Sequence, residues 1–134
     1  IKHRGLEGGL QLLGEQAAAN GKVRVKLELE TGCRLSDMVR QTHLYRIAQE
    51  AVANAMKHSG CALLRIILRK RGKKGVIEIQ DNGAGFDPQK ESAREGIGLR
   101  VMRHRANLIG IDLKISSAPG RGCKVVCEFD CEPG

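Results

Sequence analysis

Apolar residues recur at helical spacing in three segments of the chain and alternate with polar residues in five others. The helical spacing predicts helices over residues 3–19, 41–58 and 99–109. The alternation predicts strands over residues 23–29, 62–69, 76–81, 111–115 and 123–129. Because helices and strands are interspersed and the strands come largely in hairpins, we expect an α/β (α+β) two-layer sandwich, with a mixed sheet of about five strands and about three helices on one face.

The size and composition fit one folded domain spanning residues 1–134. The chain is 41% hydrophobic and has no apolar run long enough for a membrane span, so it should fold around a single core. Aromatic residues make up only 2%, which argues against modules that stack nucleic-acid bases on aromatic side chains. The net charge of +8 is compatible with an anionic partner and equally with simple solubility, and the basic run at 69–74 is interpreted as a solvated hairpin.

The five cysteines do not form a recognisable framework. Their number is odd and no CxxC pair occurs, which argues against a disulfide scaffold or a zinc knuckle. On a strand, the spacing of Cys123, Cys127 and Cys131 puts them on one face. We interpret them as small hydrophobic residues in a reducing compartment.

The helix predicted over 41–58 carries an unusual polar stripe. Glu50, Asn54 and His58 lie within one narrow strip of its surface, and Lys57 flanks it. Glutamate and asparagine offer the hard oxygen ligands that Mg²⁺ prefers, and lysine suits a phosphate. The alternative is a solvated helix edge with one ion pair.

Two glycine-rich segments follow. Asp81 comes directly after a strand, where its carboxylate can accept a hydrogen bond from an exocyclic amine, and Gly83 and Gly85 allow close backbone approach; the alternative is an ordinary turn. Further on, the sequence Gly96-Ile97-Gly98-Leu99 opens a helix whose N-terminus suits phosphate. It is neither a Walker A loop nor a dinucleotide-binding fingerprint.

Taken together, the order and the amino-acid sequences of these segments are specific enough to indicate a protein family. LYRIAQEAVANAMKHS, DNGAGF, GIGLRVMRHRA and PGRGCKVVCEF resemble the N, G1, G2 and G3 boxes of the GHKL ATPase superfamily. The wording is most similar to the catalytic ATP-binding domain of bacterial sensor histidine kinases, in the nitrate-sensor-like subfamily that partners LuxR-like response regulators. The resemblance covers essentially the whole chain and implies a sandwich of the GHKL, or Bergerat, type.

The resemblance also implies roles for the polar stripe. Asn54 matches the ligand of the Mg²⁺ that bridges the ATP phosphates. Glu50 matches a glutamate that in relatives activates a nucleophile or orients the water of the metal, a role that is less settled in two-component kinases. Lys57 and His58 match positions near the phosphates.

In the same way, the G boxes imply a nucleotide pocket. Asp81 matches the aspartate that holds the adenine amino group, and the glycines of DNGAGF match those that line the base pocket. Gly96 and Gly98, with Ile97 and Leu99, match the hinge that ends a mobile ATP lid over residues 87–95. Cys123 replaces the usual threonine of the G3 box, which is expected to weaken adenine binding.

The resemblance implies an incomplete kinase, with ATP and Mg²⁺ as its ligands. Nothing in the sequence matches the phosphoacceptor histidine, which in the family lies on a separate dimerisation domain, and His3 lacks the acidic neighbour. The domain would supply the γ-phosphoryl group to that histidine and, isolated, hydrolyse ATP slowly at best. The implied partners are the dimerisation domain of a homodimeric parent and a LuxR-like response regulator.

Other functions stay open at this point. An anti-sigma-factor-type serine kinase shares the boxes, and a nucleotide-binding module without catalysis would keep the pocket alone. Direct nucleic-acid binding is not expected, because aromatics and a recognition motif are missing. The expected location is a cytoplasmic domain of a longer protein, and the sequence is compatible with a parent anchored in the inner membrane.

Overall fold

The computed structural model describes residues 5–19, 21–30, 32–58, 60–87, 89–90 and 98–132. Every predicted helix and strand is present in these segments. The helices are α1 (Gly5–Ala18), α2 (Met38–His58) and α4 (Leu99–Leu108), and the strands are β1 (Arg24–Leu29), β2 (Leu63–Arg71), β3 (Lys74–Asp81), β4 (Asp112–Ser117) and β5 (Cys123–Asp130). Among the described residues, no helix combines the length and the apolar character needed to cross a membrane.

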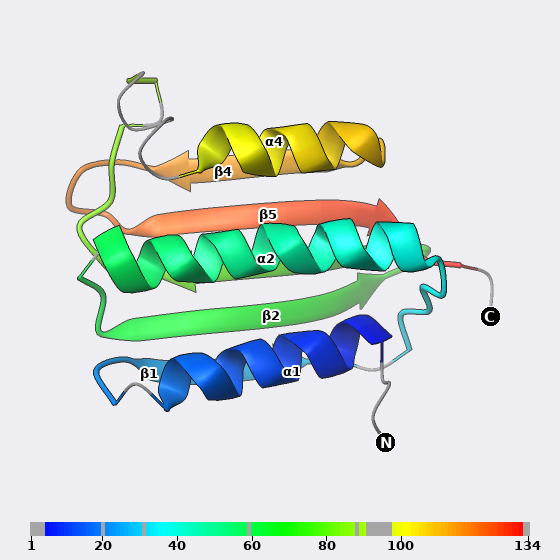
Figure 1. Ribbon diagram of the computed structural model, residues 1–134, viewed down its shortest axis with the longest axis horizontal. Helices are drawn as coiled ribbons and strands as arrows, with labels where there is room; N and C mark the ends of the chain where they lie inside the picture. The colour runs from blue at the N-terminus through cyan, green and yellow to red at the C-terminus, as the bar shows by residue number, and fades with distance from the viewer. Residues whose placement is uncertain are drawn as a thin grey trace.

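The five strands form one mixed sheet in the order β1-β2-β3-β5-β4. Strand β1 pairs with β2 in parallel, and the other neighbours are antiparallel. The parallel pair requires a crossover, and α2 supplies it. All three helices cover the same face of the sheet (Figure 1). The expected two-layer α/β sandwich is therefore confirmed.

Helix α2 begins three residues earlier than the apolar spacing predicts. The Asp37 carboxylate accepts hydrogen bonds from the backbone N–H groups of Val39 and Arg40, at 3.0 and 3.2 Å. An aspartate in this position satisfies the unpaired N–H groups of a first helical turn. Val39 is exposed, so the start of the helix has no apolar periodicity to reveal it.

The basic hairpin between β2 and β3 is tighter than predicted. The strand pairing continues to Arg71 and Lys74, which leaves a two-residue turn at Gly72 and Lys73. Gly72 has a φ of +62°, which favours glycine. The turn is exposed, as expected of a solvated hairpin, and Lys74 forms an ion pair with Asp130 at 2.7 Å.

The hydrophobic core fills the space between the helices and the sheet. Its α2 contribution is the predicted face, with Ile47 in addition: Leu44, Ile47, Ala48, Ala51, Val52 and Ala55. From β5, Val125, Cys127 and Phe129 are buried in the same core, as the alternation predicts. Cys123 is half-buried at the start of β5, and Cys131 lies just beyond its end. The core thus fixes α2 against the ends of β3 and β5.

Candidate functional site

A small cavity of about 90 Å³ lies between the helices and the ends of β3 and β5. Most of its wall is apolar, and two polar side chains, Asn54 and Asp81, reach it from different elements. Its lining residues are Ala51, Asn54, Ile79, Asp81, Gly85, Phe86, Leu99, Met102, Cys123 and Val125. The structure therefore brings together five of the predicted site residues from four separate segments of the chain.

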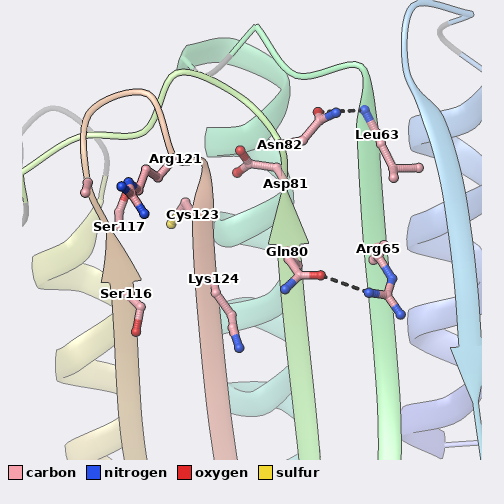
Figure 2. Close-up of a pocket in the computed structure, with 11 residues that line it drawn as sticks. Leu63, Arg65, Gln80, Asp81, Asn82, Ser116, Ser117, Arg121, Cys123 and Lys124 are labelled. Carbon is pink, nitrogen blue, oxygen red and sulfur yellow. Dashed lines mark hydrogen bonds between the residues drawn. The ribbon is translucent and has the colours of Figure 1, made fainter.

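Asp81 is the last residue of β3, and the turn that follows fixes its side chain. The Gly83 N–H donates a hydrogen bond of 2.8 Å to Oδ1 of Asp81. Gly83 does not line the cavity itself, so it acts on the site by orienting the carboxylate. Figure 2 shows Asp81 beside Asn82 and the start of β5.

Asn82 is a structural residue that the sequence analysis did not single out. Its Oδ1 accepts hydrogen bonds of 2.9 Å from the backbone N–H groups of Ala62 and Leu63, and Figure 2 shows the bond with Leu63. These bonds tie the loop after β3 to the start of β2. Its position directly after a strand and before glycine is the signal that identifies it, since asparagine side chains often bond nearby backbone groups in turns.

The loop after β3 is also held against the β4–β5 turn. Ser117 Oγ donates to the Gly122 carbonyl oxygen at 2.6 Å and accepts from the Phe86 N–H at 3.0 Å. Gly85 has a φ of +70°, and a Cβ at this position would collide with the Ala118 carbonyl oxygen. Gly85 is thus required by the close approach of two backbones. Ser117 and Phe86 escaped prediction because neither belongs to a periodic pattern or a metal-ligating pair.

Cys123 faces Asp81 across the β3–β5 pair. Burial and the negative charge of Asp81, opposed by a hydrogen bond with Ser117, together raise the pKa of the Cys123 thiol to about 11. The thiol therefore stays protonated at neutral pH. Cys123 contributes a small neutral wall to the cavity.

Helix α2 presents the predicted polar stripe to the same region. Asn54 lines the cavity, and Glu50, one turn earlier, is half-buried. Gly98, the N-cap of α4, has a φ of +69°, and any side chain there would collide with the Glu50 carboxylate. Glu50 therefore lies against the start of α4, a proximity that helical spacing alone does not predict.

The other predicted residues fall in three groups. Lys57 is exposed on α2 and does not line the cavity. His58 ends α2, but its side chain is outside the described residues. Gly96 and Ile97, and most of the predicted lid at 87–95, also lie outside the described residues.

A larger cavity of about 540 Å³ borders the same strand ends. Asp81 lines both cavities, and the other charged residues around the larger one are Arg65 and Lys124 on the strands and Arg121 in the β4–β5 turn. Arg65 donates to Gln80 at 3.1 Å, shown in Figure 2, and forms an ion pair with Glu28 at 2.6 Å. No α2 residue lines this larger cavity, so only the smaller cavity brings Asn54 of α2 together with Asp81.

The smaller cavity has the chemistry of a site for a flat heterocycle. Ile79, Met102 and Val125 supply apolar walls, and the Asp81 carboxylate can accept a hydrogen bond from an amino group. The Asn54 amide oxygen and the Glu50 carboxylate are hard ligands on one side of α2. These donors fit a divalent cation next to the heterocycle.

Comparison with known proteins points to one family. Residues 39–133 match the family described as histidine kinase-, DNA gyrase B-, and HSP90-like ATPase. The chain is 38% identical over 85 residues to the sensor protein VraS of Staphylococcus saprophyticus, an alignment that covers 63% of this chain and 24% of that protein. The chain thus spans about a quarter of the length of this curated relative.

Solved structures share the fold. The ATP binding domain of PrrB from Mycobacterium tuberculosis is 24% identical with a TM-score of 0.74, and the match covers 93% of each chain. A blue-light activated histidine kinase from Erythrobacter litoralis is 14% identical with a TM-score of 0.76, over 91% of this chain and 40% of that chain.

Proposed function

Because the chain belongs to the histidine kinase-, DNA gyrase B-, and HSP90-like ATPases, we propose that it is the ATP-binding catalytic domain of a sensor histidine kinase. The observation that carries this proposal is the convergence of Asn54 from α2 and Asp81 from β3 on one apolar-walled cavity. A curated relative of this chain, VraS, is a sensor protein, and the solved structures that share the fold include histidine kinases.

The base-binding half of the site is built around Asp81. Its carboxylate accepts a hydrogen bond from the adenine amino group, while the Gly83 N–H holds the carboxylate in place. The apolar side chains of Ile79, Met102 and Val125 contact the faces of the base. Guanine presents a carbonyl oxygen at the corresponding position, so Asp81 selects adenine by electrostatic repulsion of guanine.

The phosphate-binding half lies along α2 and at the start of α4. Asn54 would hold Mg²⁺ through its amide oxygen, with the Glu50 carboxylate in support. The metal supplies charge neutralisation for the phosphates when it is bound. Gly98 lets the first turn of α4 approach Glu50 closely, and the backbone N–H groups of this turn face the phosphates. Lys57, which is exposed on α2, offers a positive charge to the phosphates.

Phosphoryl transfer depends mainly on positioning and charge stabilisation. We therefore propose that this chain holds ATP and that a histidine on a separate dimerisation domain accepts the γ-phosphoryl group. The wording of the N and G2 boxes supports a nitrate-sensor-like parent that acts as a homodimer, with a LuxR-like response regulator downstream. The proposed location of the domain is cytoplasmic.

Titration calorimetry with nucleotides tests the proposal. Mg·ATP is expected to bind at one saturable site. GTP is expected to bind at least tenfold more weakly, because guanine has a carbonyl oxygen where adenine has the amino group that donates to Asp81. Addition of a dimerisation domain that bears the phosphoacceptor histidine is then expected to give acid-labile phosphorylation. Absence of Mg·ATP binding by the folded chain would overturn the proposal.

A further inference from the structure

The end of the sheet opposite the nucleotide site holds a pair of cysteines. Figure 1 shows the segment that leads into α2, in cyan, meeting the end of β5, in red, at this end of the sheet. Cys33 lies in the first of these segments and Cys131 directly follows the second, and the two thiols are close enough for Cys131 to raise the pKa of the Cys33 thiol. The two cysteines are far apart in the sequence, and no spacing rule pairs them.

Backbone hydrogen bonds fix the two segments side by side. The Glu132 N–H donates to the Arg34 carbonyl oxygen at 2.7 Å, one residue beyond each cysteine. The Cys131 N–H donates to the Lys73 carbonyl oxygen at 2.8 Å. Ser36 adds a hydroxyl hydrogen bond of 2.7 Å to the Glu132 carboxylate. The two thiols are therefore held together by the fold.

Gly75 makes room for the Cys33 thiol and for the ring of Phe129. A Cβ at Gly75 would lie 2.7 Å from Sγ of Cys33, so the sulfur occupies space above β3 that any other residue would fill. Both cysteines are half-buried, which leaves them accessible to a small oxidant. By contrast, Cys61 and Cys127 are buried in the core.

We propose that Cys33 and Cys131 are a reversible redox pair that forms an intramolecular disulfide when the protein meets a peroxide. In the first step, the peroxide transfers one oxygen atom to the Cys131 sulfur, giving a sulfenic acid and water. In the second step, the Cys33 sulfur loses its proton and attacks the Cys131 sulfur. The S–S bond forms, the S–O bond breaks, and the hydroxide that leaves takes up a proton to give a second water.

The environment of Cys33 supports this order of steps. Burial, together with the neighbouring Cys131, raises the pKa of the Cys33 thiol to about 12. Cys33 therefore stays protonated near neutral pH and is a poor first target for the peroxide. Its deprotonation limits the second step, so disulfide formation should accelerate as the pH rises from 7 to 9.

The disulfide would join the segment before α2 to the end of the sheet. It closes a loop that includes most of the chain, and constraining such a long loop restricts the unfolded state strongly. We expect the thermal midpoint of the oxidised protein to rise by about 5 °C or more. Along β3, about 20 Å separate Gly75 from Asp81, so nucleotide affinity should change by less than about twofold.

The test is peptide mapping of the full chain after treatment with hydrogen peroxide. Remaining thiols are blocked with N-ethylmaleimide, and the protein is digested without reduction and analysed by mass spectrometry. We expect a peptide that links Cys33 to Cys131, an intact mass lower by two hydrogens, and reversal by dithiothreitol. Recovery of both cysteines in the blocked form, or a link to a different cysteine, would overturn the proposal.

Thermal melts of variants provide the matched comparison. Cys33→Ser and Cys131→Ser are each expected to lose the peroxide-induced rise of the midpoint. Cys123→Ser, which removes a half-buried cysteine at the other end of the sheet, is expected to retain it. If the peroxide-induced rise of the thermal midpoint persists in both Cys33→Ser and Cys131→Ser, the stabilisation does not come from this disulfide, and the proposal is wrong. The mapping of the unaltered chain decides the matter if a variant fails to fold.

Discussion

Replacement of Asp81 by asparagine isolates the contact that is proposed to recognise adenine. In the folded chain, the Gly83 N–H donates to Oδ1 of Asp81 at 2.8 Å. Asparagine can keep this bond by placing its single carbonyl oxygen toward Gly83. Its NH₂ group then faces the amino group of the base, so a donor meets a donor where a carboxylate oxygen had accepted a hydrogen bond.

The magnitude follows from the loss of a charge-assisted hydrogen bond. Such a bond contributes about 1.5–3 kcal/mol, which corresponds to a roughly 10- to 150-fold weaker affinity for ATP. GTP, which makes no favourable contact with the carboxylate, should bind Asp81→Asn at least as well as the unaltered chain. The preference for ATP over GTP is therefore expected to shrink or vanish.

The assay is calorimetric titration of both nucleotides in the presence of Mg²⁺. Asp112→Asn is the matched control, because it makes the same change of charge at an exposed position of β4 that does not line the cavity. It should leave both affinities unchanged. Equal affinities of the unaltered chain for ATP and GTP, or an equal effect of the two substitutions, would refute the reasoning.

Three further predictions concern the metal, a backbone contact and acid stability. Asn54→Ala should abolish the Mg²⁺ dependence of ATP affinity, which titrations with and without EDTA will measure. Gly85→Ala should cost at least about 2 kcal/mol in urea unfolding, and more than Gly21→Ala, because both positions have positive φ but only Gly85 meets a backbone carbonyl. Hydrogen bonds from Ser36 lower the pKa of Glu132, so the stabilisation that this carboxylate provides is present at neutral pH and lost as the pH falls through its folded pKa. Glu132→Gln should therefore be less stable than the unaltered chain at pH 7, and the difference in unfolding free energy should shrink to zero as the pH falls through the folded pKa of Glu132.

The helices and strands could be predicted because periodic apolar spacing marks each buried face. The order of the strands in the sheet could not be predicted in this way. The pairing of β3 with β5, rather than with β4, brings Asp81 opposite Cys123. No local pattern specifies this pairing, since it depends on how the whole sheet packs against the helices. The same limit applies to helix ends such as Asp37, where a side-chain cap and not apolar spacing sets the boundary.

The candidate site could be predicted at positions where the residue type itself indicates a chemical role. Asn54 belongs to a polar stripe on a helix and Asp81 directly follows a strand, and both reach one cavity. Ser117 could not be identified in this way, because its hydroxyl connects two loops that only the folded sheet brings together. The contact between Glu50 and Gly98 likewise depends on how α4 packs beside α2.

Amide hydrogen exchange with two ligands tests the division of the site most directly. Adenosine, which lacks phosphates, is predicted to slow exchange in residues 79–87, around Asp81, and to leave the first turn of α4 unchanged. Mg·ATP is predicted to slow exchange in both regions, because the phosphates accept hydrogen bonds from the helix start that Gly98 opens. Equal protection of both regions by adenosine, or protection by Mg·ATP at the cavity beside Arg65 instead, would contradict the proposed placement of ATP.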